Sequence, residues 1–157
     1  MDDDRPTEIG VCGMRISDVL RQKGTAVATI APTATVRQLV TALREHNIGA
    51  AVVTTDGDAV VGIVSERDVV RKLDSDLAAN LLDAKVSEIM TRDVLTCGPD
   101  DTVDSLAETM TERRIRHMPV LEHGRLAGIV SIGDVVKSHI RQLETDREQL
   151  ESYIAHG

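Results

Sequence analysis

The stretch GIVSERDVV at residues 62–70 recurs as GIVSIGDVV at residues 128–136. Its Gly, Ser and Asp all return at one offset of 66 residues. Upstream, the pattern P-x-x-T-V at residues 32–36 returns at residues 99–103, an offset of 67, so a single residue differs in the turn between. Ordered matches of this kind indicate that the chain contains two copies of one structural unit.

Each copy shows the same order of local signals. A short extended piece (26–29 or 94–96) precedes a proline, and an amphipathic helix follows that begins at Thr35 or Thr102 and closes near Asn47 or Arg114. Two strands joined by a tight turn come next, and a second helix starts at Ser65 or Ser131. The expected strands are 50–54 and 59–64 in copy one, and 117–121 and 126–130 in copy two.

These signals predict a mixed α/β (α+β) fold of tandem β-α-β-β-α repeats, packed sheet to sheet about a pseudo-two-fold axis, because one such unit cannot cover its own sheet. The expected organisation is a flexible acidic N-terminus (1–13), repeat 1 (14–73), a helical or loose linker (74–85), repeat 2 (86–140) and a helical tail (141–157). The tail continues a long charged helix over 136–154, whose heptad-like apolar stripe packs either onto its own domain or onto a second subunit.

Composition narrows the function. The chain of 157 residues has a net charge of −8, which argues against nucleic acids and anionic membranes as partners. Aromatic residues make up 1%, so any planar ligand would lie between aliphatic walls. There is neither a signal-peptide pattern nor an apolar run of membrane-spanning length, and a cytoplasmic protein is expected, with Cys12 and Cys97 as reduced thiols. The scattered histidines and the lack of a nucleophile–base pattern predict no metal site and no enzyme.

The repeated Ser-x-x-Asp allows two interpretations. It resembles a capping box, in which the side chains only satisfy the start of the helix. It also places a hydroxyl where a phosphate is favoured and a carboxylate where it could accept hydrogen bonds from a cis-diol. Copy one adds Arg67, which could pair with phosphate, whereas copy two has Ile132 and Gly133 there. Its compensating charges are expected from a basic group before the second strand: Arg113, Arg114, Arg116 and His117. Some of these residues are expected to face a central phosphate-binding region; the alternative is a solvated basic helix end that complements the helix dipole.

With Gly-Ile-Val-Ser in both copies, His-Asn-Ile-Gly-Ala at 46–50 and Arg-His-Met-Pro-Val at 116–120, the chain closely resembles the CBS domain pair, or Bateman module, over residues 14–140. The run from Gly62 to Arg71 is particularly similar to small stand-alone bacterial members. The resemblance implies binding of AMP, ADP, ATP, NAD(H) or S-adenosylmethionine in clefts between the sheets, and dimerisation into a flat disc.

Carried over by position, the resemblance assigns phosphate contacts to Ser65 and Ser131 and ribose contacts to Asp68 and Asp134. It assigns the adenine to the segments 26–28 with 50–52 and 94–96 with 118–120. Together with the basic candidates, the predicted binding residues are Ser65, Arg67, Asp68, Ser131, Asp134, Ala26, Val27, Ala50, Val52, Arg116, His117, Met118 and Pro119.

The expected function is a regulatory protein that senses an adenosyl ligand and signals to an unidentified client protein. The protein is expected to be a homodimer and to require no cofactor. The alternatives are a structural dimerisation or adaptor domain whose motifs are only helix caps, and an enzyme that acts on nucleotides. Copy one, with Ser65, Arg67 and Asp68, is expected to form the better nucleotide cleft.

Overall fold

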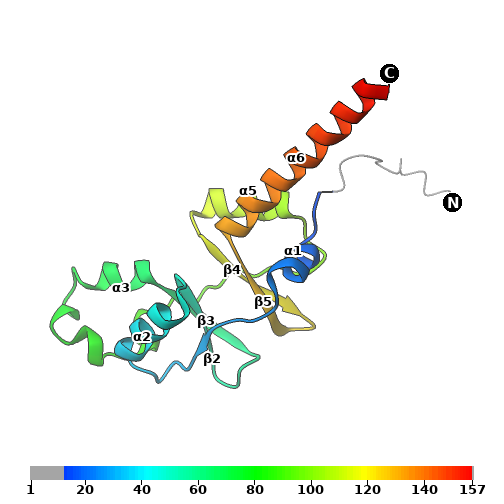
Figure 1. Ribbon diagram of the computed structural model, residues 1–157. Coiled ribbons are helices and arrows are strands. Elements are labelled where there is room, and N and C mark those ends of the chain that lie inside the picture. The colour runs from blue at the N-terminus through cyan, green and yellow to red at the C-terminus, as the bar shows by residue number, and fades with distance from the viewer. Residues whose placement is uncertain (1–12, 157) are drawn as a thin grey trace.

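The computed structural model describes residues 13–156, and the expected acidic N-terminus, Cys12 included, lies outside them apart from Gly13. The chain folds into two repeats, each with a small sheet and covering helices (Figure 1). In the first sheet, β1 (Thr29–Ile30) is parallel to β2 (Ala50–Thr54), which is antiparallel to β3 (Val60–Ser65). The second sheet pairs β4 (His117–Glu122) with β5 (Arg125–Ser131). This is the mixed α/β fold of tandem repeats that the sequence predicts.

The helices begin and end at the residues that carry local signals. Helix α2 (Val36–His46) starts after Thr35, whose hydroxyl accepts from the Gln38 amide at 3.2 Å, while Gln38 Oε1 accepts from the Thr35 amide at 2.9 Å. Helix α5 (Val103–Arg113) starts after Thr102, whose hydroxyl accepts from the Ser105 amide at 3.1 Å. Both end on left-handed residues, Asn47 and Arg114. The predicted capping box and both helix ends are therefore confirmed.

The remaining helical segments connect or extend the repeats. The duplicated motif leads into α3 (Glu66–Lys72) in the first repeat and into α6 (Ile132–His156) in the second, which confirms the long C-terminal helix. The predicted linker folds into a 3₁₀ helix, η1 (Ala78–Asp83), and is fastened to the first repeat by the buried Leu81. Two short helices that we did not anticipate, α1 (Ile16–Lys23) and α4 (Val86–Ile89), form the beginning of the two repeats.

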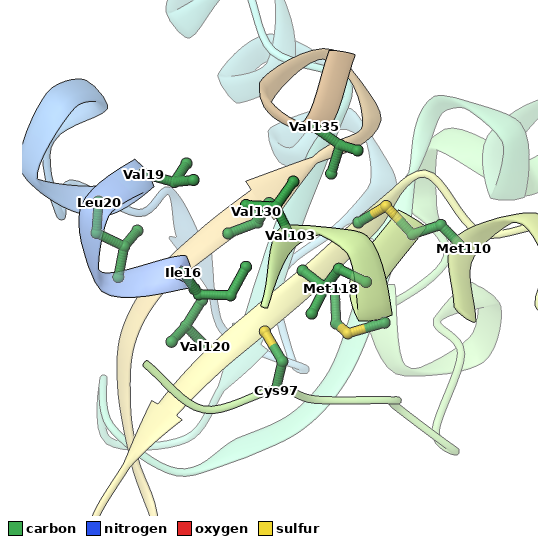
Figure 2. Packing of buried hydrophobic residues seen from close by; sticks show 11 residues of the cluster. Ile16, Val19, Leu20, Cys97, Val103, Met110, Met118, Val120, Val130 and Val135 are labelled. Atoms are coloured by element: carbon green, nitrogen blue, oxygen red, sulfur yellow. The ribbon is translucent and has the colours of Figure 1, made fainter. Parts of the chain in front are cut away.

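These two short helices pack across the repeat boundary. Helix α1 contributes Ile16, Val19 and Leu20 to the core of the second repeat, and in Figure 2 Ile16 lies beside Val120. Helix α4 contributes its apolar side chains to the core of the first repeat. Figure 1 shows α1 (blue) next to the hairpin of β4 and β5 rather than next to β2 and β3. The crossing places one chain segment from each repeat against the other.

The structure differs from the prediction at the first strand of each repeat. Residues 26–28 precede β1, which begins only at Thr29, and residues 94–96 form no strand. In the second repeat, one isolated parallel bridge pairs Cys97 with Val120. The Cys97 amide donates to the Pro119 carbonyl, and the Leu121 amide donates to the Cys97 carbonyl. Residues 26–28 and residues 94 and 95 instead line the two clefts between the repeats.

Other sequence-based expectations concern single residues. Cys97 is buried in the second core, and burial raises the pKa of its thiol to about 12, so it acts as an apolar packing residue. Within residues 13–156, no cluster of three or more His, Cys, Asp or Glu side chains is placed to hold a metal ion. In the same range, every helix is too short or too polar to cross a bilayer.

Candidate functional site: two clefts between the repeats

The repeated motif has the same geometry at both strand-to-helix junctions. In the first repeat, the Ser65 amide and hydroxyl both donate to Asp68 Oδ2, at 2.8 and 3.1 Å. In the second, the Ser131 amide and hydroxyl both donate to Asp134 Oδ2, at 2.8 and 3.0 Å. Each Ser–Asp pair therefore closes the start of its helix, as the capping interpretation expects. One oxygen of each carboxylate is used for this purpose.

The surroundings of the two carboxylates differ. Among residues 13–156, no hydrogen-bond donor reaches Oδ1 of Asp68, and Asp68 lines a cleft. Asp134 is instead covered by Lys23 of α1, whose ammonium group donates to Asp134 Oδ2 at 2.6 Å and to the Ile129 carbonyl at 2.8 Å. Burial raises the pKa of Asp134, but the hydrogen bonds from Lys23 and Ser131 outweigh burial and hold that pKa below its ordinary value.

We call the first cavity the Asp68 cleft. Its volume is about 480 Å³, which lies within the range of small-molecule sites. One wall comes from the first repeat, with Ser65 and Asp68 at the start of α3. The opposite wall comes from the second repeat and from the segment that leads into it, with Val94 and Leu95 and the residues before β4. A ligand in this cleft would therefore contact both repeats.

Arginines are the most numerous charged residues of the Asp68 cleft. Four arginines line it, and within the described part of the chain none of them forms an ion pair: Arg67, Arg71, Arg114 and Arg116. Glu66, Asp68 and Asp93 are its acidic residues. Guanidinium groups without a carboxylate partner are suited to bind phosphate bidentately. The cleft thus combines a carboxylate with an unused oxygen, unpaired cations and aliphatic surface from Val94, Leu95 and Ile115.

The second cavity, the Lys23 cleft, has a volume of about 540 Å³. Its walls are the segment 26–28 before β1, the turn at 46–50 that leads into β2, and Ile129 with Ser131 from β5. Its charged or ionisable groups are Lys23 and two histidines, His46 and His117. This cleft has fewer charged residues than the Asp68 cleft, and its Lys23 is already paired with Asp134.

His117 lies where the two clefts meet, since it lines both of them together with Gly49, Ala50 and Ser131. Burial lowers the pKa of His117, and the nearby charges of Lys23 and Arg116 lower it further. The imidazole is therefore neutral at pH 7. A bound anion would reverse part of this effect by offsetting the two cations.

The predicted site residues fall into three groups. Ser65, Arg67, Asp68, Ala50, Arg116, His117 and Ser131 line the Asp68 cleft, and Ala26, Val27, Ala50, His117 and Ser131 line the Lys23 cleft. Asp134 lies beneath Lys23. The third group is buried and lines neither cleft: Val52, Met118 and Pro119.

The Asp68 cleft brings together residues of both motifs. Arg114 and Arg116 line it beside Ile132 and Gly133, whose lack of charge they are expected to compensate, and the motif residues of the first copy line the same cleft. The cation of the Lys23 cleft comes from α1, which the sequence analysis did not consider. No motif marks Lys23, because its role depends on α1 crossing to the other repeat.

The family model of the CBS domain matches residues 16–75 and again residues 86–140. The chain therefore belongs to the CBS domain family, with two copies of the domain in tandem. The mitochondrial CBS domain-containing protein CBSX3 of Arabidopsis thaliana is 34% identical to it over 161 residues, which covers 98% of this chain and 78% of the relative.

Solved structures of CBS-domain proteins share the fold. The CBS-domain containing protein ATU1752 from Agrobacterium tumefaciens is 44% identical, with a TM-score of 0.77 over 81% of this chain and 94% of that chain. The CBS domain pair of protein MJ0100 is 26% identical, with a TM-score of 0.71 over 83% of this chain and 98% of the other. That structure is a complex with 5′-methylthioadenosine and S-adenosyl-L-methionine.

Proposed function

We propose that this chain is a regulatory module that binds an adenine nucleotide in the Asp68 cleft and passes the binding event to a client protein. The observation that carries the proposal is the composition of this cleft. Within residues 13–156, it holds one carboxylate with an unused oxygen, Asp68, beside arginines without ion-pair partners, such as Arg67 and Arg116. A nucleotide offers the complementary groups, a diol that donates hydrogen bonds and a phosphate that accepts them.

Each part of the nucleotide has a matching surface. The ribose hydroxyls would donate to Oδ1 of Asp68, since Oδ2 is held by the Ser65 amide and hydroxyl. The phosphate would face Arg67 and Arg116, and the base would lie against Val94 and Leu95. Adenosyl compounds in the MJ0100 complex support the ligand class, because that protein shares the fold and the tandem domains.

Regulation requires a ligand that stabilises one arrangement of the repeats over another. The Asp68 cleft meets this condition because its walls belong to both repeats, with Asp68 on one side and Arg116 on the other. A nucleotide that bridges these residues favours the arrangement in which the walls are close together. A client protein that binds either arrangement preferentially would detect the difference.

A thermal-shift panel with AMP, ADP, ATP, NAD⁺, NADH and S-adenosylmethionine tests the proposal, because a ligand of the folded state raises Tm by mass action. We expect at least one nucleotide to raise Tm in the wild type and in Asp134→Asn, and to lose its effect in Asp68→Asn. The two variants make the same chemical change at equivalent positions of the two motifs. No shift with any ligand at millimolar concentration would overturn the proposal.

One observation favours a second function, an adaptor domain without a ligand. Both Ser–Asp pairs already satisfy the start of their helices, so the motifs have a structural role in the absence of a nucleotide. For an adaptor, Asp68→Asn should change only stability. The panel separates the two functions, because only a nucleotide-binding module loses a ligand-induced Tm shift in this variant.

A further inference from the structure

The chain that follows α4 is joined to β3 through the backbone. Helix α4 ends at Ile89, and the Thr91 amide then donates to the Ile63 carbonyl oxygen at 2.9 Å. The Ile63 amide donates back to the Thr91 carbonyl oxygen at 3.0 Å, and Met90 packs beside this bridge, close to Gly62. Because this connection uses backbone groups alone, it does not extend to the carboxylate of the motif that follows β3.

Helix α1 makes the corresponding connection to β5 with a side chain. Leu20 packs against β5 so closely that a Cβ at Gly128 would lie 2.7 Å from Leu20 Cδ2. Because α1 continues to Lys23, the amides that follow Leu20 donate within the helix instead of to β5. The Lys23 ammonium group donates to the Ile129 carbonyl oxygen at 2.8 Å, and Ile129 is the counterpart of Ile63 in the repeat. A side chain thus takes the place of a backbone amide.

The same ammonium group changes the surface of the second cleft. It also donates to Asp134 Oδ2 at 2.6 Å, an oxygen that already accepts from the Ser131 amide and hydroxyl. Asp68 lines its cleft, whereas Asp134, at the equivalent position, belongs to the wall of neither cleft in the described chain. Lys23 lines the Lys23 cleft in its place. A ribose in this cleft would therefore meet a cation where the Asp68 cleft offers a carboxylate.

The ion pair between Lys23 and Asp134 is unfavourable to separate. Their side chains are only 29% and 14% exposed, so each charge depends on the other for most of its solvation. A ligand that takes the carboxylate for a ribose must first move the ammonium group away. Its apparent affinity is then reduced by the small fraction of chains in which the pair is open. Lys23 therefore competes with a ribose for the same carboxylate.

We propose that Lys23 determines the ligand specificity of the second cleft by occupying Asp134 in place of a ribose, so that each chain binds one nucleotide. This role of Lys23 rests on the proposed function, in which the Asp68 cleft is the nucleotide site. The motif itself does not limit the second cleft in this way, since Ser131 and Asp134 are both present and hold the same geometry as the first pair. One substitution at position 23 should therefore open the second cleft to a nucleotide.

Equilibrium dialysis against millimolar ATP counts the molecules bound to each chain. We expect one for the wild type and two for Lys23→Ala. Lys23→Ala/Asp134→Asn should bind one again, because the added site uses the carboxylate of Asp134. Arg21→Ala is the matched control and should bind one, since it removes a cation from the same helix at a position that lines neither cleft.

Two ATP molecules on the wild type, or no added molecule on Lys23→Ala, overturn the role of Lys23. Lys23→Met keeps an unbranched stem and should show the same gain as Lys23→Ala, so a variant that fails to fold does not end the test. A failure of the Asp68 cleft gives a different result, a wild type that binds no ATP. In that case, one ATP on Lys23→Ala that is lost in Lys23→Ala/Asp134→Asn still supports the role of Lys23, and no ATP on Lys23→Ala overturns it.

Discussion

Lys23 Nζ lies 2.6 Å from Asp134 Oδ2, although 111 residues separate the two in the sequence. The carboxylate of the second motif is therefore already paired with a cation, whereas the carboxylate of the first motif has no such pair with any residue that the structure describes. A ligand that hydrogen-bonds to Asp134 must displace Lys23 or bind alongside it. The two copies of one sequence motif thus provide chemically different sites.

Replacing Lys23 by Met should lower the free energy of unfolding by about 1–2 kcal/mol, because it leaves the carboxylate of Asp134, which is 14% exposed, without its cation. Urea denaturation at pH 7 measures the change. The double variant Lys23→Met/Asp134→Asn should recover part of the loss, since the unpaired charge is then absent. Additive losses in the double variant would show that the two residues are not coupled.

Replacing Arg67 by Ala should weaken ATP binding about tenfold, the effect of losing one charge-assisted hydrogen bond to phosphate. Titration calorimetry at two salt concentrations measures it. Adenosine, which has no phosphate, should bind Arg67→Ala and the wild type equally. Arg125→Ala is the control, because Arg125 is exposed at the start of β5 and lines neither cleft. If Arg67→Ala lost affinity for adenosine to the same extent as for ATP, Arg67 would not contact the phosphate.

The pH dependence of stability should include a contribution from His117. Burial lowers the pKa of its imidazole in the folded protein, so the unfolded chain takes up a proton first as the pH falls below about 6.5. The wild type should therefore lose stability from pH 7 to pH 5, and His117→Gln should lose less over the same interval. Denaturant unfolding of both proteins at the two pH values measures these losses. Equal losses of stability in the wild type and in His117→Gln would contradict the prediction.

Gly62 allows Met90 and Thr91, the two residues that follow α4, to approach the first sheet. A Cβ at this position would lie 2.7 Å from Met90 Sδ and 3.0 Å from the Thr91 carbonyl oxygen, and the latter accepts from the Ile63 amide. Gly62→Ala should therefore destabilise the protein by about 1–3 kcal/mol. Gly133→Ala is the control, since the nearest atom to its Cβ is 3.5 Å away. Chemical denaturation of both variants distinguishes crowding from a general effect of alanine.

Local signals in the sequence were sufficient to predict most helices and strands. Thr35 and Thr102 mark helix starts through hydrogen bonds to residues three positions away, and these bonds form in the structure. The turn at His123 and Gly124 likewise forms, with both residues at positive φ. Such features depend on neighbouring residues alone, so they can be read from the chain.

The interactions that sequence analysis missed are all long-range. Neither the crossing of α1 and α4 nor the pairing of Lys23 with Asp134 has a local signal, because each depends on how the two repeats pack. The same limit explains the candidate sites. The motif residues Ser65 and Asp68 could be named in advance, but the arrangement of Arg114 and Arg116 opposite them could not.

The crossed packing of α1 has a consequence for the order of events during synthesis. The Ile16 amide donates to the Asp101 carbonyl oxygen, and Lys23 donates to Asp134. Because both partners lie far downstream in the sequence, α1 leaves the ribosome long before they are synthesised. At ordinary translation rates the wait for a segment 111 residues away is roughly 5–20 s. Contacts of such high sequence separation also slow folding itself. The nascent chain must keep the apolar face of α1 from other partners throughout this interval.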